Sequence, residues 1–202
     1  CSRSSRAHPD YLDPGLSYTV QGWGIMLPVH LGLVTYKMVN GPDGATLIPA
    51  MAKDMPEISS DGLDYKFELR DGVTYSDGTA IKASDFKSSI KRLFLVDSPG
   101  VGFFTGIEGA EQFAKTKKGD IAGIVTDDAA KTVEIKLTSP QGDFLHILAT
   151  LFASFVPPNT PAKDQSTAGI PANGPYMIQN YTPNRSVTVV RNPKWKSIEG
   201  IP

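Results

Sequence analysis

The sequence has one cysteine, no long apolar run and almost no net charge. Cys1 is its only cysteine, which excludes an internal disulfide and a multi-cysteine zinc site. The longest apolar candidate, residues 144–156, is interrupted by polar side chains and falls short of the roughly 18 residues of a membrane-spanning helix. Twenty basic and 21 acidic residues give a net charge of -1, so no surplus charge attracts nucleic acid or anionic lipid.

Recognisable catalytic motifs are missing as well. The sequence has no nucleophile elbow, no zinc-protease helix motif and no Walker loop. Its three histidines, His8, His30 and His146, are far apart and lack ligand spacing. The Asp-Gly pairs lack the alternating oxygen ligands of a calcium loop, and turn chemistry accounts for them. We therefore expect no metal, no cofactor and no enzymatic activity.

What is abundant is turn-forming residues, with 19 glycines and 16 prolines. Between the turns, alternating patterns predict strands and 3.6-residue periods predict helices. Residues 157–161 contain three prolines and should be irregular. The mixture lacks a regular βαβ order and predicts a mixed α/β (α+β) fold. The predicted helices are 25–38, 83–96, 108–117 and 143–151; the predicted extended segments are 11–24, a hairpin of 65–70 with 73–75, strand 132–137, and a hairpin of 176–181 with 186–191.

Four stretches, in order along the chain, carry a family resemblance. They are Leu12-Asp13-Pro14; residues 47–52; residues 61–73 leading through 76–79 to Ala83, Asp85, Ser89 and Arg92; and Asn173-Gly174-Pro175-Tyr176 followed by Arg191-Asn192-Pro193 and Trp195. Together they resemble the family 5 extracellular solute-binding proteins of ABC importers, which include oligopeptide- and dipeptide-binding proteins. One departure is Lys82, at a position where such proteins often have a helix-capping threonine.

The resemblance implies a periplasmic-binding-protein-like type II fold, with two lobes closing on a solute. We expect an N-terminal fragment of such a protein. Residues 1–45 would begin the first lobe, with a tether at 1–10. Residues 46–164 would form an inserted smaller domain, and residues 165–202 would return to the first lobe before the second begins.

The function implied is capture of a peptide or another small solute, such as a sugar or a nickel chelate, and its delivery to ABC permease subunits. Such proteins bind by hydrogen bonding and apolar enclosure, without bond breaking. We expect a monomer. Two alternatives stay open. One is a sensor or adhesion lipoprotein with the same fold, and the other is a hydrolase, which only scattered Ser, His and Asp residues support.

The resemblance also indicates candidate ligand contacts. In peptide-binding relatives, a segment shortly after the Leu-Asp-Pro motif pairs with the ligand backbone as an added strand. The corresponding residues are 17–23, and the candidates in them are Tyr18, Thr19, Val20, Gln21 and Trp23. Phe103 and Phe104, on a glycine-flanked loop, could reach the same cleft. Each aromatic side chain could instead be an ordinary packing residue.

Cys1 is a candidate for lipid attachment. An isolated N-terminal cysteine before the polar, basic residues 2–6 looks like the start of a mature bacterial lipoprotein. A lipid there would hold the protein on the extracytoplasmic side of the membrane without a spanning segment. The alternative is that the printed sequence merely starts at this residue.

Overall fold

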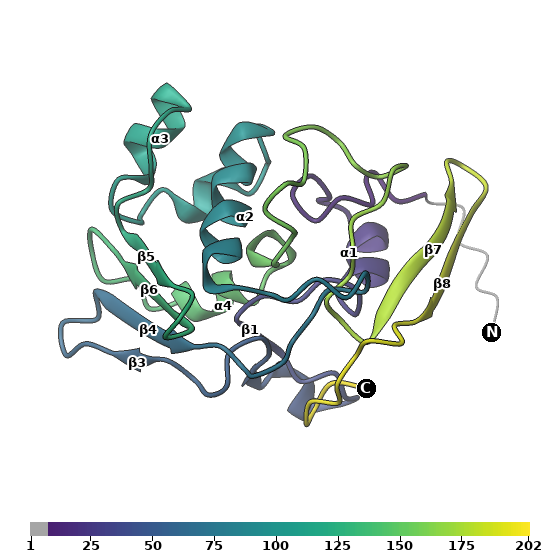
Figure 1. Ribbon diagram of the computed structural model, residues 1–202, viewed down its shortest axis with the longest axis horizontal. Helices are drawn as coiled ribbons and strands as arrows, with labels where there is room; N and C mark the ends of the chain where they lie inside the picture. The colour runs from purple at the N-terminus through teal and green to yellow at the C-terminus, as the bar shows by residue number, and fades with distance from the viewer. Residues whose placement is uncertain (1–7) are drawn as a thin grey trace.

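The computed structural model describes residues 8–202, and these form a mixed α/β fold (Figure 1), which confirms the predicted class. The helices are α1 (Val20–Met26), α2 (Ala83–Leu95), α3 (Ala110–Thr116) and α4 (Phe144–Leu148), with short 3-10 turns η1 (Pro42–Ala45), η2 (Val101–Phe104) and η3 (Leu151–Ala153). The strands are β1 (Val34–Tyr36), β2 (Leu47–Pro49), β3 (Glu57–Ile58), β4 (Asp64–Glu68), β5 (Ile124–Asp127), β6 (Thr132–Lys136), β7 (Tyr176–Thr182) and β8 (Ser186–Arg191).

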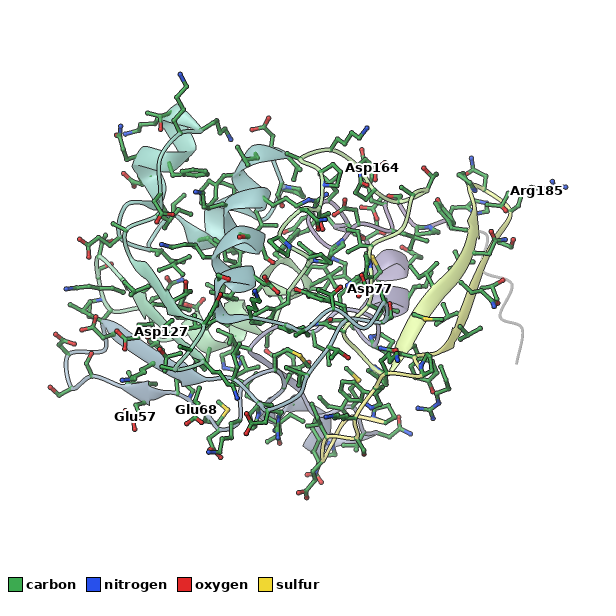
Figure 2. All side chains as sticks on the ribbon, in the orientation of Figure 1. Glu57, Glu68, Asp77, Asp127, Asp164 and Arg185 are labelled. Carbon is green, nitrogen blue, oxygen red and sulfur yellow. The ribbon has the colours of Figure 1, made fainter. Side chains whose placement is uncertain are left out.

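An antiparallel sheet of order β3-β4-β6-β5 forms one side of the molecule, with α2 across it (Figure 1). Strict alternation in β4 and β6 buries one face, including Phe67 and Val133, which pair in register. The other face is charged, and Lys66 lies opposite Glu134 with 3.3 Å between Nζ and Oε1. Glu57 and Glu68 project outward from this sheet in Figure 2. The predicted strands at 65–70 and 132–137 are confirmed.

The predicted hairpin of residues 65–70 with 73–75 is wrong. Strand β4 pairs with β3 on one side and β6 on the other, so no edge is left for a third partner. Gly72 has a φ of 65° and turns the chain away from the sheet. Residues 73–75 then make only an isolated bridge, Thr74 to Ala80. Tyr75 is fully buried, and its hydroxyl donates to Asp85 Oδ2 at 3.1 Å.

Helix α2 confirms the prediction for residues 83–96 and carries the main apolar stripe, including Phe86, Ile90 and Phe94. Its N-cap residue is Lys82, whose side chain has no acceptor for the free amides of the first turn. Two carboxylates act as hydrogen-bond acceptors in its place. Asp85 Oδ2 accepts from Lys82 N at 3.1 Å, and Asp128 Oδ1 accepts from Ser84 N at 2.8 Å. The helix is therefore capped from a distant turn.

The N-terminal segment differs most from the sequence prediction. Residues 20–26 form helix α1 instead of an extended strand, and residues 34–36 form strand β1 instead of the end of a helix. Thr19 caps α1 by accepting from Gly22 N at 3.2 Å. Two glycines give α1 a low intrinsic propensity, so packing of the fully buried Met26 stabilises it.

Asp10 braces the turn into α1. Its carboxylate accepts from Tyr18 N at 2.7 Å, Thr19 Oγ1 at 2.7 Å and Ser17 Oγ at 2.9 Å. Partial burial raises the pKa of Asp10, but these hydrogen bonds outweigh it and hold the pKa below its usual value. The ionised carboxylate therefore fixes the backbone just before the helix.

The chain returns to its own N-terminal part at residues 173–176. Asn173 accepts from Leu31 N and donates to Leu31 O, both at 2.8 Å. The hairpin of β7 and β8 follows and packs beside α1, with Arg185 at its tip (Figures 1 and 2). The predicted hairpin of 176–181 with 186–191 is confirmed. The division at residues 45 and 164 stays a prediction, since the largest core cluster includes residues from Leu31 to Ile201.

A buried ion pair joins the N-terminal segment to α2. The Arg92 guanidinium makes two hydrogen bonds to Asp13, at 2.9 Å to Oδ1 and 2.6 Å to Oδ2. The exposed fraction of the side chain is 6% for Arg92 and 0% for Asp13. Four backbone groups add further hydrogen bonds: Gly15 N and Gln165 N donate to Asp13, and Pro161 O and Lys163 O accept from Arg92.

Replacing Arg92 by methionine should lower the free energy of unfolding by about 3–5 kcal/mol, because Asp13 would stay buried without a counter-charge. The exposed pair of Lys53 and Glu68, 3.5 Å apart, offers a control. Lys53→Met should cost at most about 1 kcal/mol. Urea unfolding of both variants measures the difference, and equal losses would contradict a special role for the buried pair.

Candidate functional site

An apolar groove of about 440 Å³ lies beside the start of α1. It is lined by Tyr18, Thr19, Val20, Trp23, Gly24 and Leu27. Val20 is 85% exposed and Tyr18 is 59% exposed, the two largest exposed fractions among the large apolar side chains of residues 8–202. None of the lining residues is charged at neutral pH, so the groove favours contact with uncharged, apolar groups.

A single buried ring, Phe152 of η3, supports the aromatic side chains around this groove. Its ring centroid lies 5.5 Å from that of Trp23 in an edge-on arrangement and 5.8 Å from that of Tyr18. Phe103, on the 3-10 turn η2, lies 6.1 Å from the same ring. The Trp23 indole N–H donates to Ser17 O at 2.8 Å, which fixes the indole plane. Segments far apart in sequence thus meet at one aromatic cluster.

Gly100 makes room for the Phe152 ring. A Cβ added at Gly100 would lie 2.5 Å from Phe152 Cγ, closer than real Cβ contacts. The position needs glycine because of this close approach, since its φ of -83° is open to any residue. Gly102, two residues on in the same turn, faces open space and has no atom within 4 Å of such a Cβ.

The predicted site residues do not all gather at the groove. Tyr18, Thr19, Val20 and Trp23 line it. Gln21 is exposed on α1 but is not among the lining residues. Phe103 does not line the groove. It is 38% exposed and packs against Phe152, the ring that also contacts Tyr18 and Trp23.

Two features of the predicted site are wrong. Phe104 is fully buried in the core, so it presents no surface to a solute. Residues 20–23 are helical, and their backbone cannot pair with a ligand as an added strand. Sequence reasoning also missed Gly24 and Leu27, which line the groove only because α1 is a helix, and Phe152, whose role depends on long-range packing. Cys1 lies outside the described residues.

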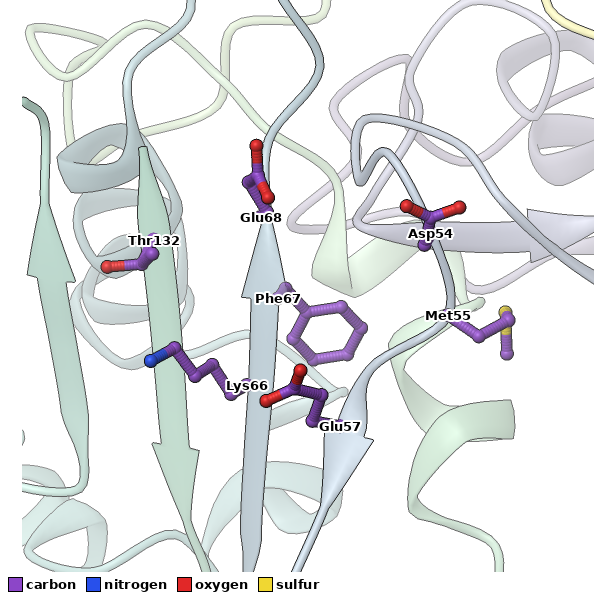
Figure 3. A pocket seen from close by; sticks show the side chains of 7 residues that line it. All are labelled: Asp54, Met55, Glu57, Lys66, Phe67, Glu68 and Thr132. Carbon is purple, nitrogen blue, oxygen red and sulfur yellow. The ribbon is translucent and has the colours of Figure 1, made fainter. Parts of the chain in front are cut away.

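A second depression, of about 150 Å³, lies at the β3 edge of the sheet (Figure 3). Figure 3 shows Glu57 on β3 and Lys66 on β4 beside it, with Asp54 on the preceding loop. Its lysine pairs with Glu134 across the sheet. This small polar hollow is a weaker candidate for solute binding, since binding sites are larger and mostly apolar.

Neither a metal cluster nor a spanning helix occurs within residues 8–202. No group of three or more His, Cys, Asp or Glu side chains in this part of the chain is placed to hold a metal ion. Each helix among these residues is too short or too polar to cross a membrane.

His30 is a buried titratable group whose pKa is affected by its burial and by the charges of Asp13 and Arg92. It is 2% exposed, and its Nδ1 has no hydrogen-bond partner among residues 8–202. Burial lowers the pKa of His30 to about 4; the Asp13 charge opposes this shift and the Arg92 charge adds to it. His30 is therefore neutral in the folded protein at pH 7.

The architecture matches that of periplasmic oligopeptide-binding proteins, which have the type II fold. With a TM-score of 0.81, the chain superposes on the oligopeptide-binding protein OppAIV of Borrelia burgdorferi, at 28% identity, covering 94% of this chain and 38% of that one. The chain therefore has part of a periplasmic-binding-protein-like type II fold.

The chain belongs to the bacterial extracellular solute-binding proteins, family 5, whose sequence model matches residues 46–200. This confirms the predicted family, and its members are binding proteins and not enzymes, as expected. The chain is 29% identical over 199 residues to the probable D,D-dipeptide-binding periplasmic protein DdpA of Escherichia coli, covering 94% of this chain and 35% of DdpA. It is 28% identical over 204 residues to the oligopeptide-binding protein OppA of Bacillus subtilis, again covering 94% and 35%. The chain thus spans about a third of the length of these relatives.

Gly100→Ala should displace the Phe152 ring and lower the free energy of unfolding by about 1–3 kcal/mol, as overpacking in a core does. The displaced ring should also change the aromatic circular dichroism. Gly102→Ala is the matched control and should change neither quantity appreciably. Urea unfolding and near-ultraviolet spectra test this, and similar behaviour of the two variants would contradict the packing role of Gly100.

The buried His30 predicts a pH dependence of stability. The unfolded histidine, with a pKa near 6.5, takes up a proton at a higher pH than the folded one, whose pKa is about 4. The stabilising contribution is therefore complete above about pH 6.5 and falls by up to about 3 kcal/mol as the pH drops to 4. Urea unfolding across this range should show a steeper loss for the unmodified chain than for His30→Leu. Parallel pH profiles would refute the prediction.

Proposed function

We propose that this chain forms part of the substrate-binding component of an ABC importer, and that the groove beside α1 contacts the captured peptide or other small solute. The observation that carries the proposal is the exposure of Tyr18 and Val20 on a rigid aromatic support, in a chain of family 5. Large apolar side chains held at the surface indicate that another body covers them. The peptide-binding names of the relatives support a peptide as the solute.

Recognition at this groove is by side chains. The Tyr18 amide is already engaged by Asp10 Oδ2, and the backbone from Val20 onward is helical. Most of the lining offered to a solute is the apolar surface of Val20, Trp23 and Leu27 and the faces of aromatic rings. Such a wall accepts many uncharged side chains, because apolar burial is not directional.

Capture requires a second wall. The groove is open to solvent, and affinity comes from enclosing a ligand on both sides. We propose that the remaining part of the relatives' length, which has no counterpart in these 202 residues, supplies that wall. A solute that contacts both walls favours the closed arrangement. In this proposal the closed monomer docks on permease subunits at the extracytoplasmic face, and a lipid on Cys1 keeps it there.

Val20→Asp in the full-length parent protein should weaken peptide binding at least about tenfold, because an ionised carboxylate would lose water in an apolar contact. The fold should tolerate the change, since Val20 is 85% exposed and an acidic residue in the first turn of α1 is favourable. Calorimetry with trialanine, trileucine and trilysine measures the effect on whichever of these peptides binds.

The matched control is Val125→Asp. Val125 is 58% exposed on β5, in the four-stranded sheet and outside the groove. It should leave affinity unchanged. Equal affinity of both variants and the unmodified parent would remove the groove from the proposed binding site.

A further inference from the structure

The chain has two Asn-Gly pairs in opposite surroundings, at residues 40–41 and 173–174. In such a pair the glycine backbone nitrogen can attack the asparagine side-chain Cγ, because no Cβ on the glycine hinders the approach. The new bond from Cγ to nitrogen closes a succinimide ring, the bond from Cγ to Nδ2 breaks, and the proton lost by the glycine nitrogen passes through solvent to Nδ2, which leaves as ammonia. A solvent water then opens the ring to aspartate or isoaspartate.

Asn40 and Gly41 are exposed, and in the described part of the chain no hydrogen bond from outside their own turn holds them. They lie in the exposed loop between β1 and β2, just before η1. A Cβ at Gly41 would have no atom within 4 Å, so no other element packs against this glycine. Within residues 8–202 the Gly41 amide donates none of the turn hydrogen bonds, so its nitrogen is unengaged.

Asn173 and Gly174 are locked by the same fold. Asn173 is 2% exposed, and both ends of its side-chain amide are held by the Leu31 backbone at 2.8 Å. The Gly174 amide donates to Val29 O at 2.9 Å. A Cβ at Gly174 would lie 2.5 Å from Pro28 O, which shows how closely this backbone is packed. Ring closure here needs all three hydrogen bonds to break.

We propose that Asn40 is a site of spontaneous deamidation in the native protein, and that the fold protects Asn173 from the same reaction. This goes beyond solute binding and does not depend on it. Conversion of Asn40 adds one negative charge and changes the formal net charge from -1 to -2. The isoaspartate product also lengthens the backbone by one atom at the turn where Gly44 N donates to Gly41 O at 3.1 Å.

Incubating the 202-residue chain in mildly alkaline buffer, followed by trypsin and tandem mass spectrometry, tests the proposal. Peptide 38–53 carries Asn40 and peptide 164–185 carries Asn173. Asn40 should gain about one dalton at least about ten times faster than Asn173, the ratio expected when local opening costs more than 1.4 kcal/mol. In denaturant the two rates should converge. An acidic variant should also appear on anion exchange.

Asn40→Gln should abolish the acidic variant without altering the unfolding midpoint, since the side chain is exposed. A synthetic peptide of residues 37–44 gives the rate of the unstructured pair. The proposal is overturned if native Asn40 reacts no faster than native Asn173, or if folding slows Asn40 tenfold or more relative to the peptide.

Discussion

The ion pair of Asp13 and Arg92 is the contact on which the remaining geometry depends. Two opposite charges are taken out of water, which is costly, and the additional hydrogen bonds of both partners offset part of that cost. The backbone at residues 15, 161, 163 and 165 completes the set. The segment leading into α1 is therefore tied to α2 and to the loop beyond η3. Asp10 and the Thr19 cap then fix the backbone between this anchor and α1.

Sequence patterns predicted the elements that are amphipathic by themselves. Strands β4 and β6 and helix α2 were found because alternation or a 3.6-residue stripe marks their buried faces. Helix α1 was missed because its glycines and exposed Val20 carry no stripe; a cap at Thr19 and the packing of Met26 create it. The pairing predicted for residues 73–75 was wrong because β3 and the distant β6 occupy both edges of β4.

In the candidate site, too, the sequence indicated some features, while others depend on long-range packing. The segment at residues 18–23 stays a predicted ligand contact: Tyr18, Thr19, Val20 and Trp23 line the groove, but the backbone is helical from Val20 onward instead of extended. The aromatic ring that orders the site, Phe152, looks in the sequence like any apolar residue of the run before it. Only the close approach of Gly100 and three neighbouring rings distinguishes it. The rings are held before any solute arrives, which lowers the entropy cost of binding.

The contacts that close the fold join residues very distant in sequence. Leu31 and Asn173 are separated by 142 positions, and Leu12 and Ser166 by 154. Their loop-closure entropy must be overcome before either contact stabilises anything. Contacts of such long sequence separation predict slow folding. The N-terminal segment can reach its final packing only after residues 166 and 173 have been synthesised, so until then its apolar side chains stay without their native partners.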